Sequence, residues 1–177
     1  MKGTESPSEI EADNLLMETV EKIRGRAAVI FGLCDKAEDA AKKSPYNPFF
    51  AIVSPPAGYL ALNGQSVKAE ETDLVSRLLF MLKMHKAYPI TGTVATGIAA
   101  KIPGSVVWKT LREEAREGIQ VNIGHPSGVI PVEADVTADE NGIRLNRVAV
   151  YRTARRIMDG VVYVKNGVSD PGNASEL

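Results

Sequence analysis

The hydrophobic pattern near the start of the chain predicts a long amphipathic helix. Its apolar positions recur every three or four residues and form one stripe: Leu16, Val20, Ile23, Ala27 and Ile30. Asp13 or Asn14 can cap this helix, and Gly32 can end it close to Leu33. Because the charged side chains lie mostly off the stripe, we expect the helix to pack on a sheet.

A second region, residues 85–105, reads HKAYPITGTVATGIAAKIPGS. Its second half is small and apolar with almost no charge before Lys101, which predicts a helix buried on every side. The loop of threonine and glycine before it leads into the helix N-terminus, where free N–H groups and the positive end of the dipole suit a carboxylate or phosphate. Gly92 would let a ligand approach the backbone. The hydroxyls of three threonines could also bind the ligand: Thr91, Thr93 and Thr96. The alternative is a core helix capped by threonine.

The apolar residues between Thr72 and Met84 predict another helix, capped by Thr72 or Asp73. Its broad apolar face includes Leu74, Leu78 and Leu82. Before it, residues 35–44 suit a short exposed helix or turn, and residues 49–53 and 59–62 suit short strands. We expect these elements to serve core packing.

From Ile119 onward the pattern changes to strands. Residues 119–123 alternate, the turn GHPSG follows at residues 124–128, and residues 129–136 form the next strand. A hairpin signal at residues 139–142 returns the chain as a strand to residue 151, and residues 154–164 predict a further strand with a bulge at Gly160. GHPSG is either a plain turn or a strained one that aims N–H groups and the Ser127 hydroxyl at an anion.

Composition narrows the classes of function. The chain has 177 residues, enough for one domain, and 44% of them are hydrophobic. The 21 basic and 22 acidic side chains nearly balance and aromatic residues make up only 6%, so nucleic acid and membrane surfaces are not favoured partners. No apolar run approaches the length of a membrane-spanning helix, and we expect a reducing, cytoplasmic compartment.

Cys34 is the one cysteine of the sequence, which rules out an internal disulfide and a thiolate metal cluster. It follows a predicted helix C-terminus and stands beside Asp35, a setting that disfavours the reactive thiolate. We therefore assign Cys34 no catalytic role.

The two histidines each adjoin a glycine motif: His85 precedes TGTVATG, and His125 lies within GHPSG. No third metal ligand stands at a recognisable spacing and HExxH is absent, so we expect no metal site. Acid–base catalysis and a structural or binding role both remain open for a histidine. The two motifs together supply the substrate-binding candidates: Thr91, Gly92, Thr93, Thr96, Gly124, His125, Pro126, Ser127 and Gly128.

Weaker candidates are His85, Lys86 and Arg155. On a strand, Arg155 and Arg156 face opposite ways, so one arginine near the chain end could hold a substrate carboxylate bidentately. The alternative is a solvated edge that discourages pairing between sheets. The sequence lacks a phosphate loop, a GxGxxG dinucleotide motif and a GxSxG nucleophile elbow, and we expect no cofactor.

Three segments resemble the C-terminal half of PrpF-type proteins: MHKAYPITGTVATGIAAKIPGSVV, IGHPSGVIPVEADV and RVAVYRTARRIMDGVVYV. The resemblance spans residues 10–164. The family includes 2-methylaconitate isomerase, 4-oxalomesaconate tautomerase and methylitaconate isomerase. It implies an α+β fold similar to diaminopimelate epimerase, with two lobes that each wrap a mixed or antiparallel sheet round a central buried helix. Residues 94–102 would be that helix in the second lobe, and its entry and GHPSG would line the cleft between lobes.

The chain departs from the family because the first lobe has no counterpart in it. That lobe carries an RGGTSK-like lysine motif and an NCGN-like cysteine loop, which are the leading proton-transfer groups of the family. Cys34 and Lys86 stand in the wrong contexts to replace them. The family's chemistry is a cofactor-free 1,3-proton shift on an unsaturated di- or tricarboxylate, which needs a base, an acid and groups that stabilise enolate-like charge. This chain supplies only the anion-binding groups.

Three hypotheses remain for a chain with a polar segment at 1–12, one lobe at 13–165 and a polar tail at 166–177. The chain is a fragment of a PrpF-type isomerase, a non-catalytic carboxylate-binding or interaction module, or a half-enzyme that needs a separate first lobe or a second copy of itself. The expected ligand is a small unsaturated carboxylate. An exposed cleft wall or sheet edge would favour a homodimer or association with a separate N-terminal lobe.

Overall fold

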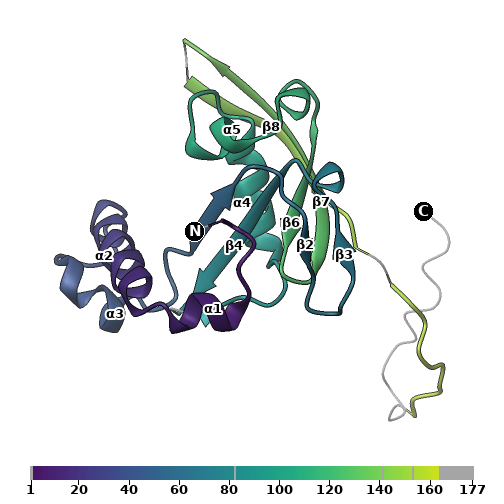
Figure 1. Cartoon of the computed structure of the whole chain (residues 1–177), viewed down its shortest axis with the longest axis horizontal. Helices are drawn as coiled ribbons and strands as arrows, with labels where there is room; N and C mark the ends of the chain where they lie inside the picture. The colour runs from purple at the N-terminus through teal and green to yellow at the C-terminus, as the bar shows by residue number, and fades with distance from the viewer. Residues whose placement is uncertain (1, 82, 141, 153, 164–177) are drawn as a thin grey trace.

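The computed structural model of the chain describes residues 2–81, 83–140, 142–152 and 154–163. Helices near the N-terminus lie beside a mixed sheet, and the longest helix of the second half packs against the sheet (Figure 1). The helices are α1 (Pro7–Ala12), α2 (Asn14–Ile30), α3 (Ala40–Lys43), α4 (Ile90–Ala100) and α5 (Val106–Thr110), with 3₁₀ turns η1 (Ala37–Asp39), η2 (Ala69–Glu71) and η3 (Glu113–Ala115). The predicted α+β class is confirmed. No helix among the described residues combines the length and apolar character that crossing a membrane requires.

The main sheet has the strand order β1-β4-β6-β7-β8, with β5 paired to β4. Its strands are β1 (Phe50–Ser54), β4 (Leu74–Phe80), β5 (Lys83–Met84), β6 (Gln120–His125), β7 (Gly128–Asp139) and β8 (Gly142–Val150). β4 and β6 run parallel, and the other neighbours are antiparallel. A separate two-stranded sheet joins β2 (Tyr59–Leu60) to β3 (Ser66–Val67).

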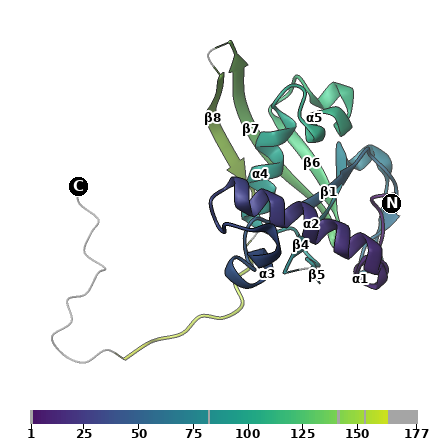
Figure 2. The ribbon, with the colours of Figure 1, turned by 90° about the vertical axis from the view of Figure 1, so that its left-hand side faces the viewer.

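The first predicted helix forms as α2, and Asp13 caps it by accepting a hydrogen bond from the Leu16 N–H at 2.9 Å. Its predicted stripe is only partly buried, since Ile23 and Ile30 are 50% and 82% exposed. Helix α2 lies mainly against η1 and α3 rather than on the sheet, and Figure 1 shows it beside α3 at the left of the sheet, with Figure 2 giving the view from that side. The cause is Arg24, whose buried guanidinium donates to the carbonyls of Ser44 and Asn47 and ties the helix to that loop.

Helix α1 lies within residues 1–12, for which the sequence predicts only a polar segment. The Ser6 hydroxyl accepts from the Glu9 N–H, and the Glu9 carboxylate accepts from the Ser6 N–H. This is a capping box with proline at the first helical position, a recognisable helix start. The segment was polar in composition but carried a helix signal in its spacing.

The helix predicted from Thr72 to Met84 is wrong, because residues 74–80 form strand β4. The strand lies between β1 and β6, and its residues 74–79 are all buried. Leu74 and Leu78 pack towards α4, whereas Val75 and Leu79 belong to clusters on the opposite face. A strand covered on both faces loses the alternation of apolar and polar residues, so its apolar positions also fit helical spacing.

Helix α4 forms in the predicted region but begins at Ile90, so the threonine and glycine residues belong to its first turns rather than to a loop. The prediction of burial on every side is wrong. The side facing the sheet is buried and consists of small residues: Gly92, Thr93, Thr96, Gly97 and Ala100. Thr91 and Ala95 are exposed. The helix contacts β6, β7 and β8, and the small side chains let it approach the sheet closely.

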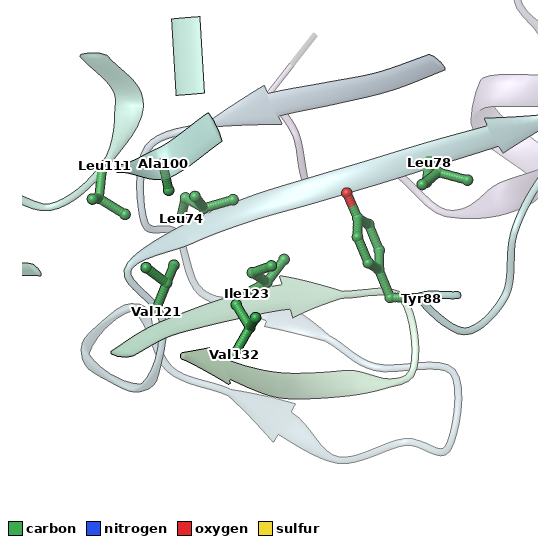
Figure 3. Packing of buried hydrophobic residues seen from close by; sticks show 8 residues of the cluster. All are labelled: Leu74, Leu78, Tyr88, Ala100, Leu111, Val121, Ile123 and Val132. Carbon is green, nitrogen blue, oxygen red and sulfur yellow. The ribbon is translucent and has the colours of Figure 1, made fainter. Parts of the chain in front are cut away.

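The largest core cluster lies between α4 and the sheet. Figure 3 shows its buried members: Leu74, Leu78, Tyr88, Ala100, Leu111, Val121, Ile123 and Val132. On the other face, α1 and α2 contribute Ile10 and Val20 to one cluster, and the β2–β3 sheet contributes Tyr59 and Val67 to another. The main sheet is therefore covered on both faces around β4.

The strand predicted for residues 154–164, with its bulge at Gly160, does not form in the described residues 154–163. This segment extends away from the sheet in Figures 1 and 2, and Ile157 and Tyr163 are 87% and 96% exposed. An apolar pattern becomes a strand only when a neighbouring edge supplies hydrogen bonds and a packed face. Residue 164 and the predicted tail at 166–177 lie outside the described residues.

Candidate functional site

The two glycine motifs come together at one end of the parallel pair β4–β6. The GHPSG turn joins β6 to β7, and residues 85–89 join β5 to α4. The Ser127 hydroxyl donates to the Lys86 carbonyl at 2.5 Å, which connects the two segments directly. The fold therefore places the start of α4 and the GHPSG turn side by side, although their residues are far apart in sequence.

The N-terminus of α4 has no side-chain cap. Pro89 occupies the N-cap position and its carbonyl accepts from the Thr93 N–H at 2.8 Å, while no side chain caps the first turn. Thr91 is exposed at this end of the helix. First-turn N–H groups without a capping acceptor favour an anion, and the helix dipole adds to that preference.

The other threonines of the motif point into the protein. Thr93 Oγ1 donates to the Pro89 carbonyl at 3.0 Å, and Thr96 Oγ1 hydrogen-bonds the Tyr88 hydroxyl at 2.9 Å. Packing against β4 explains the glycine at position 92, since a Cβ there would lie 2.5 Å from Leu78 Cδ1. Thr91 is thus the candidate threonine whose side chain is exposed, and the other candidates hold α4 against the sheet.

A chain of buried hydroxyls runs behind the site. Tyr88 hydrogen-bonds Ser76 at 2.7 Å as well as Thr96, and the Ser76 hydroxyl lies 3.1 Å from the Ile52 carbonyl, to which it donates. Each hydroxyl has one proton, so Ser76 accepts from Tyr88, and Tyr88 accepts from Thr96. Burial raises the pKa of Tyr88, which keeps it a neutral donor. Sequence reasoning missed Ser76 and Tyr88; a serine within the apolar run of β4 was the available signal.

His125 is neutral at physiological pH. Burial, with the charges of Arg77 and His85 acting in the same direction, lowers its pKa to about 4. Its Nδ1 accepts from the Ser127 N–H at 3.3 Å, so the proton belongs on Nε2. The Tyr88 ring lies 6.2 Å from the imidazole, between ring centroids. The arrangement makes His125 a hydrogen-bond donor through Nε2–H rather than a cation.

His85 stands close enough to His125 to affect its titration, so the fold does bring the two histidines together. The buried Nδ1 of His85 has no hydrogen-bond partner among the described residues. No group of three or more histidine, cysteine, aspartate or glutamate side chains in the described chain could hold a metal ion.

Tyr59 fixes the backbone of the GHPSG turn. Its hydroxyl lies 2.8 Å from the His125 carbonyl and 2.6 Å from the Gly128 carbonyl, and the two carbonyls share its single proton. Gly124 and Pro126 are buried within the same turn region, and Ser127 is exposed. Tyr59 lies on β2, far from the turn in sequence, and no spacing signal could have identified it.

The remaining candidates lie apart from this arrangement. Lys86 contributes its backbone carbonyl, and its residue is exposed. Arg155 is exposed in the extended segment, and no contact among the described residues brings it to the site. Cys34 packs with Ala28 and Ala40 in a small cluster under α2.

Comparison with known proteins gives consistent matches. The family described as PrpF protein matches residues 1–165. The chain is 42% identical to 3-methylitaconate isomerase of Eubacterium barkeri over 93% of its own length and 42% of that protein. It is 36% identical to 2-methyl-aconitate isomerase of Shewanella oneidensis over 92% of its own length and 40% of that protein. A crystal structure of methylitaconate-delta-isomerase superimposes with a TM-score of 0.78 and 38% identity, covering 97% of this chain and 45% of that one. The chain spans less than half the length of these relatives.

Proposed function

Because the chain belongs to the PrpF family, we propose that it supplies the carboxylate-binding part of an isomerase that shifts a proton within an unsaturated di- or tricarboxylate. The observation that carries the proposal is the uncapped N-terminus of α4 beside neutral His125. Relatives named for methylitaconate and methylaconitate isomerisation support the choice of ligand.

The chemistry explains why such donors are useful. A 1,3-shift breaks one C–H bond, moves the double bond by one position and forms a new C–H bond, so it needs neither an electron acceptor nor group transfer. Negative charge accumulates on the substrate carboxylate in between, and N–H donors aimed at its oxygens stabilise that charge. The Nε2–H of His125 and the first-turn N–H groups of α4 would serve this role without moving a proton themselves.

The groups that move the proton are proposed to lie elsewhere. Cys34 is buried away from the GHPSG turn, and the buried hydroxyl chain of Tyr88 has its protons committed to internal hydrogen bonds. We propose that a separate first lobe supplies the base and the acid, so that this chain acts as a half-enzyme. A non-catalytic carboxylate-binding module is the alternative for the same site.

The direct test combines a binding assay with a turnover assay on the purified chain. We expect trans-aconitate to bind measurably by calorimetry, while its ultraviolet absorbance stays constant when the chain is present alone. Adding a first-lobe polypeptide with the lysine and cysteine motifs should produce turnover. Turnover by the chain alone would contradict the assignment of the proton-transfer groups, and binding without turnover in the mixture would favour the non-catalytic module.

A substitution tests the donor role. His125→Asn keeps an acceptor near the position of Nδ1 but removes the Nε2–H donor, so trans-aconitate affinity should fall about tenfold. Gln120→Asn, at an exposed position of the same strand, is the matched control and should leave affinity unchanged. Equal affinity of the His125 variant and the control would remove His125 from the proposed site.

A further inference from the structure

Arg77 is buried on the face of β4 opposite to α4. Successive side chains of a strand point to opposite faces, and Ser76 and Leu78 face the α4 side. Arg77 is 1% exposed, and its guanidinium lies over the Tyr59 ring at 4.9 Å from the centroid. A full positive charge thus sits inside the protein, between the sheet and the N-terminal segment.

Arg77 makes no ion pair among the described residues, although the charge of the nearby Glu5 carboxylate favours its charged form. Arg77 Nε donates to the Glu5 carbonyl at 2.9 Å and Nη1 to the Ser76 carbonyl at 3.0 Å. Within the described chain, Nη2 makes no hydrogen bond and Arg77 joins no ion pair. Buried arginines are ordinarily paired, because a desolvated charge is costly without an opposite one. The free Nη2 is the donor through which a partner could be held.

A cavity of about 390 Å³ adjoins the guanidinium. We call it the Arg77 pocket; Arg77 and Tyr59 line it together with apolar residues from the β2 region and the GHPSG turn, namely Leu60, Leu62 and Pro126. The N-terminal segment, residues 4–9, forms its other wall. The pocket therefore combines one buried cationic donor with an apolar wall, which suits an anionic group attached to a small aliphatic body.

Two carboxylates limit the charge of the ligand. Glu5 and Glu9 also line the pocket, and both are engaged: Glu5 accepts from the N–H groups of Lys2 and Gly3, and Glu9 from the Ser6 N–H. These bonds hold both groups as anions, and their charge repels a multiply charged ligand more strongly than a singly charged one. We propose that the Arg77 pocket binds a small aliphatic monocarboxylate, with its carboxylate on Arg77 Nη2 and its body against Leu60 and Leu62.

This proposal is independent of the proposed function. The Arg77 pocket and the uncapped end of α4 lie on opposite sides of β4, and Tyr59 and Pro126 are the residues of the candidate site that also line the pocket. Either site can fail its test without affecting the other.

The test is a titration of the full chain with butyrate, followed by calorimetry and by the NMR signal of the Arg77 Nε–H group. We expect saturable binding with a dissociation constant of about 1 mM, accompanied by a shift of that signal. Inorganic phosphate, which carries more charge at neutral pH, should bind more weakly. Absence of saturable butyrate binding, or tighter binding of phosphate, would overturn the proposal.

Two variants decide where butyrate binds. Leu60→Glu adds a negative charge at the pocket wall, where Leu60 is 72% exposed and the fold tolerates change, and should weaken butyrate binding about threefold or more. Leu60→Gln is the matched neutral control and should bind as the parent chain does. The Arg77→Met variant, under conditions in which it is folded, should not bind butyrate. Equal affinities for the two Leu60 variants would place butyrate elsewhere and reject the pocket.

Discussion

His125 couples folding to pH because its pKa is about 4 in the folded chain against an ordinary value of 6.5. Between these values the unfolded chain binds a proton at this residue and the folded chain does not. Stability from this residue is therefore complete above about pH 6.5 and is lost as the pH falls towards 4. Burial of a neutral imidazole beside Arg77 is the physical cause.

We predict that the free energy of unfolding falls by about 2 kcal/mol through His125 between roughly pH 7 and pH 5. Urea denaturation at several pH values measures this slope. His125→Asn cannot titrate, so its stability should vary less over the same range. If the free energy of unfolding varied with pH in the same way in both proteins, folding would not change the pKa of His125, and the prediction would be contradicted.

Tyr88 provides a second prediction at the residue scale. Tyr88→Phe removes the acceptor of the Thr96 proton and the donor to Ser76, leaving buried hydroxyls without their partners. We expect a loss of about 1–3 kcal/mol in the free energy of unfolding, measured by urea denaturation. Tyr46→Phe, at a side chain that is 56% exposed, is the control and should change stability little. An equally small effect at Tyr88 would contradict the buried hydroxyl chain.

The sequence singles out the two motifs of the candidate site but not the directions in which their side chains point. TGTVATG and GHPSG stand out in the sequence by their glycines and hydroxyl side chains. In the fold, the hydrogen bond between Ser127 and Lys86 connects the two segments. Which threonine faces outward depends on the direction of α4 relative to the sheet, a tertiary property that local spacing does not contain. Tyr59 and Arg77 act from other strands, so only the assembled sheet reveals them.

Among the elements, β4 shows where periodicity misleads. The apolar residues of a strand buried on both faces satisfy a helical template, and a seven-residue run is too short for the pattern to decide. The sequence predicts α2 as a helix because it carries a cap and a longer amphipathic pattern. It does not predict the packing partner of α2, since Arg24 ties the helix to the loop after α3. Element type is thus encoded locally, whereas the contacts of an element depend on residues distant in sequence.

The contact of α4 with the sheet is tested by Gly97→Ala. An added Cβ would lie 2.8 Å from Val132 Cγ1 and 2.9 Å from Cγ2, both on β7 in the core. Although alanine favours a helix, we expect a loss of about 1–3 kcal/mol in the free energy of unfolding because the helix must move off the sheet. Gly118→Ala, which meets nothing within 4 Å, is the control. A stabilised Gly97 variant would contradict this close approach.

At the scale of the whole molecule, the described chain presents an unusual amount of exposed apolar surface near its C-terminal end. β8 is an edge strand, and Ile143 and Leu145 on it are 58% and 46% exposed. The segment that follows exposes further large apolar side chains: Ile157, Met158, Val161, Val162 and Tyr163. Exposed large apolar side chains on an edge strand are typical of a site of protein association. The chain matches only 42% of the length of 3-methylitaconate isomerase. We propose that a separate first lobe or a second copy of the chain covers this surface.

In the absence of such a partner, we predict that the purified chain forms a dimer or larger assembly, because an unpaired edge strand with apolar side chains can add a strand from a second copy. Light scattering at increasing protein concentration measures the mass, which should rise with concentration. Ile143→Lys places a charge on the edge strand and should shift the equilibrium towards monomer, whereas Arg144→Lys, at the adjacent exposed position, preserves the charge and should not. A monomer at every concentration, in the parent chain and in both variants, would contradict this prediction. The edge strand β8 would then not pair with a second copy, and the proposed partner would have to bind another surface.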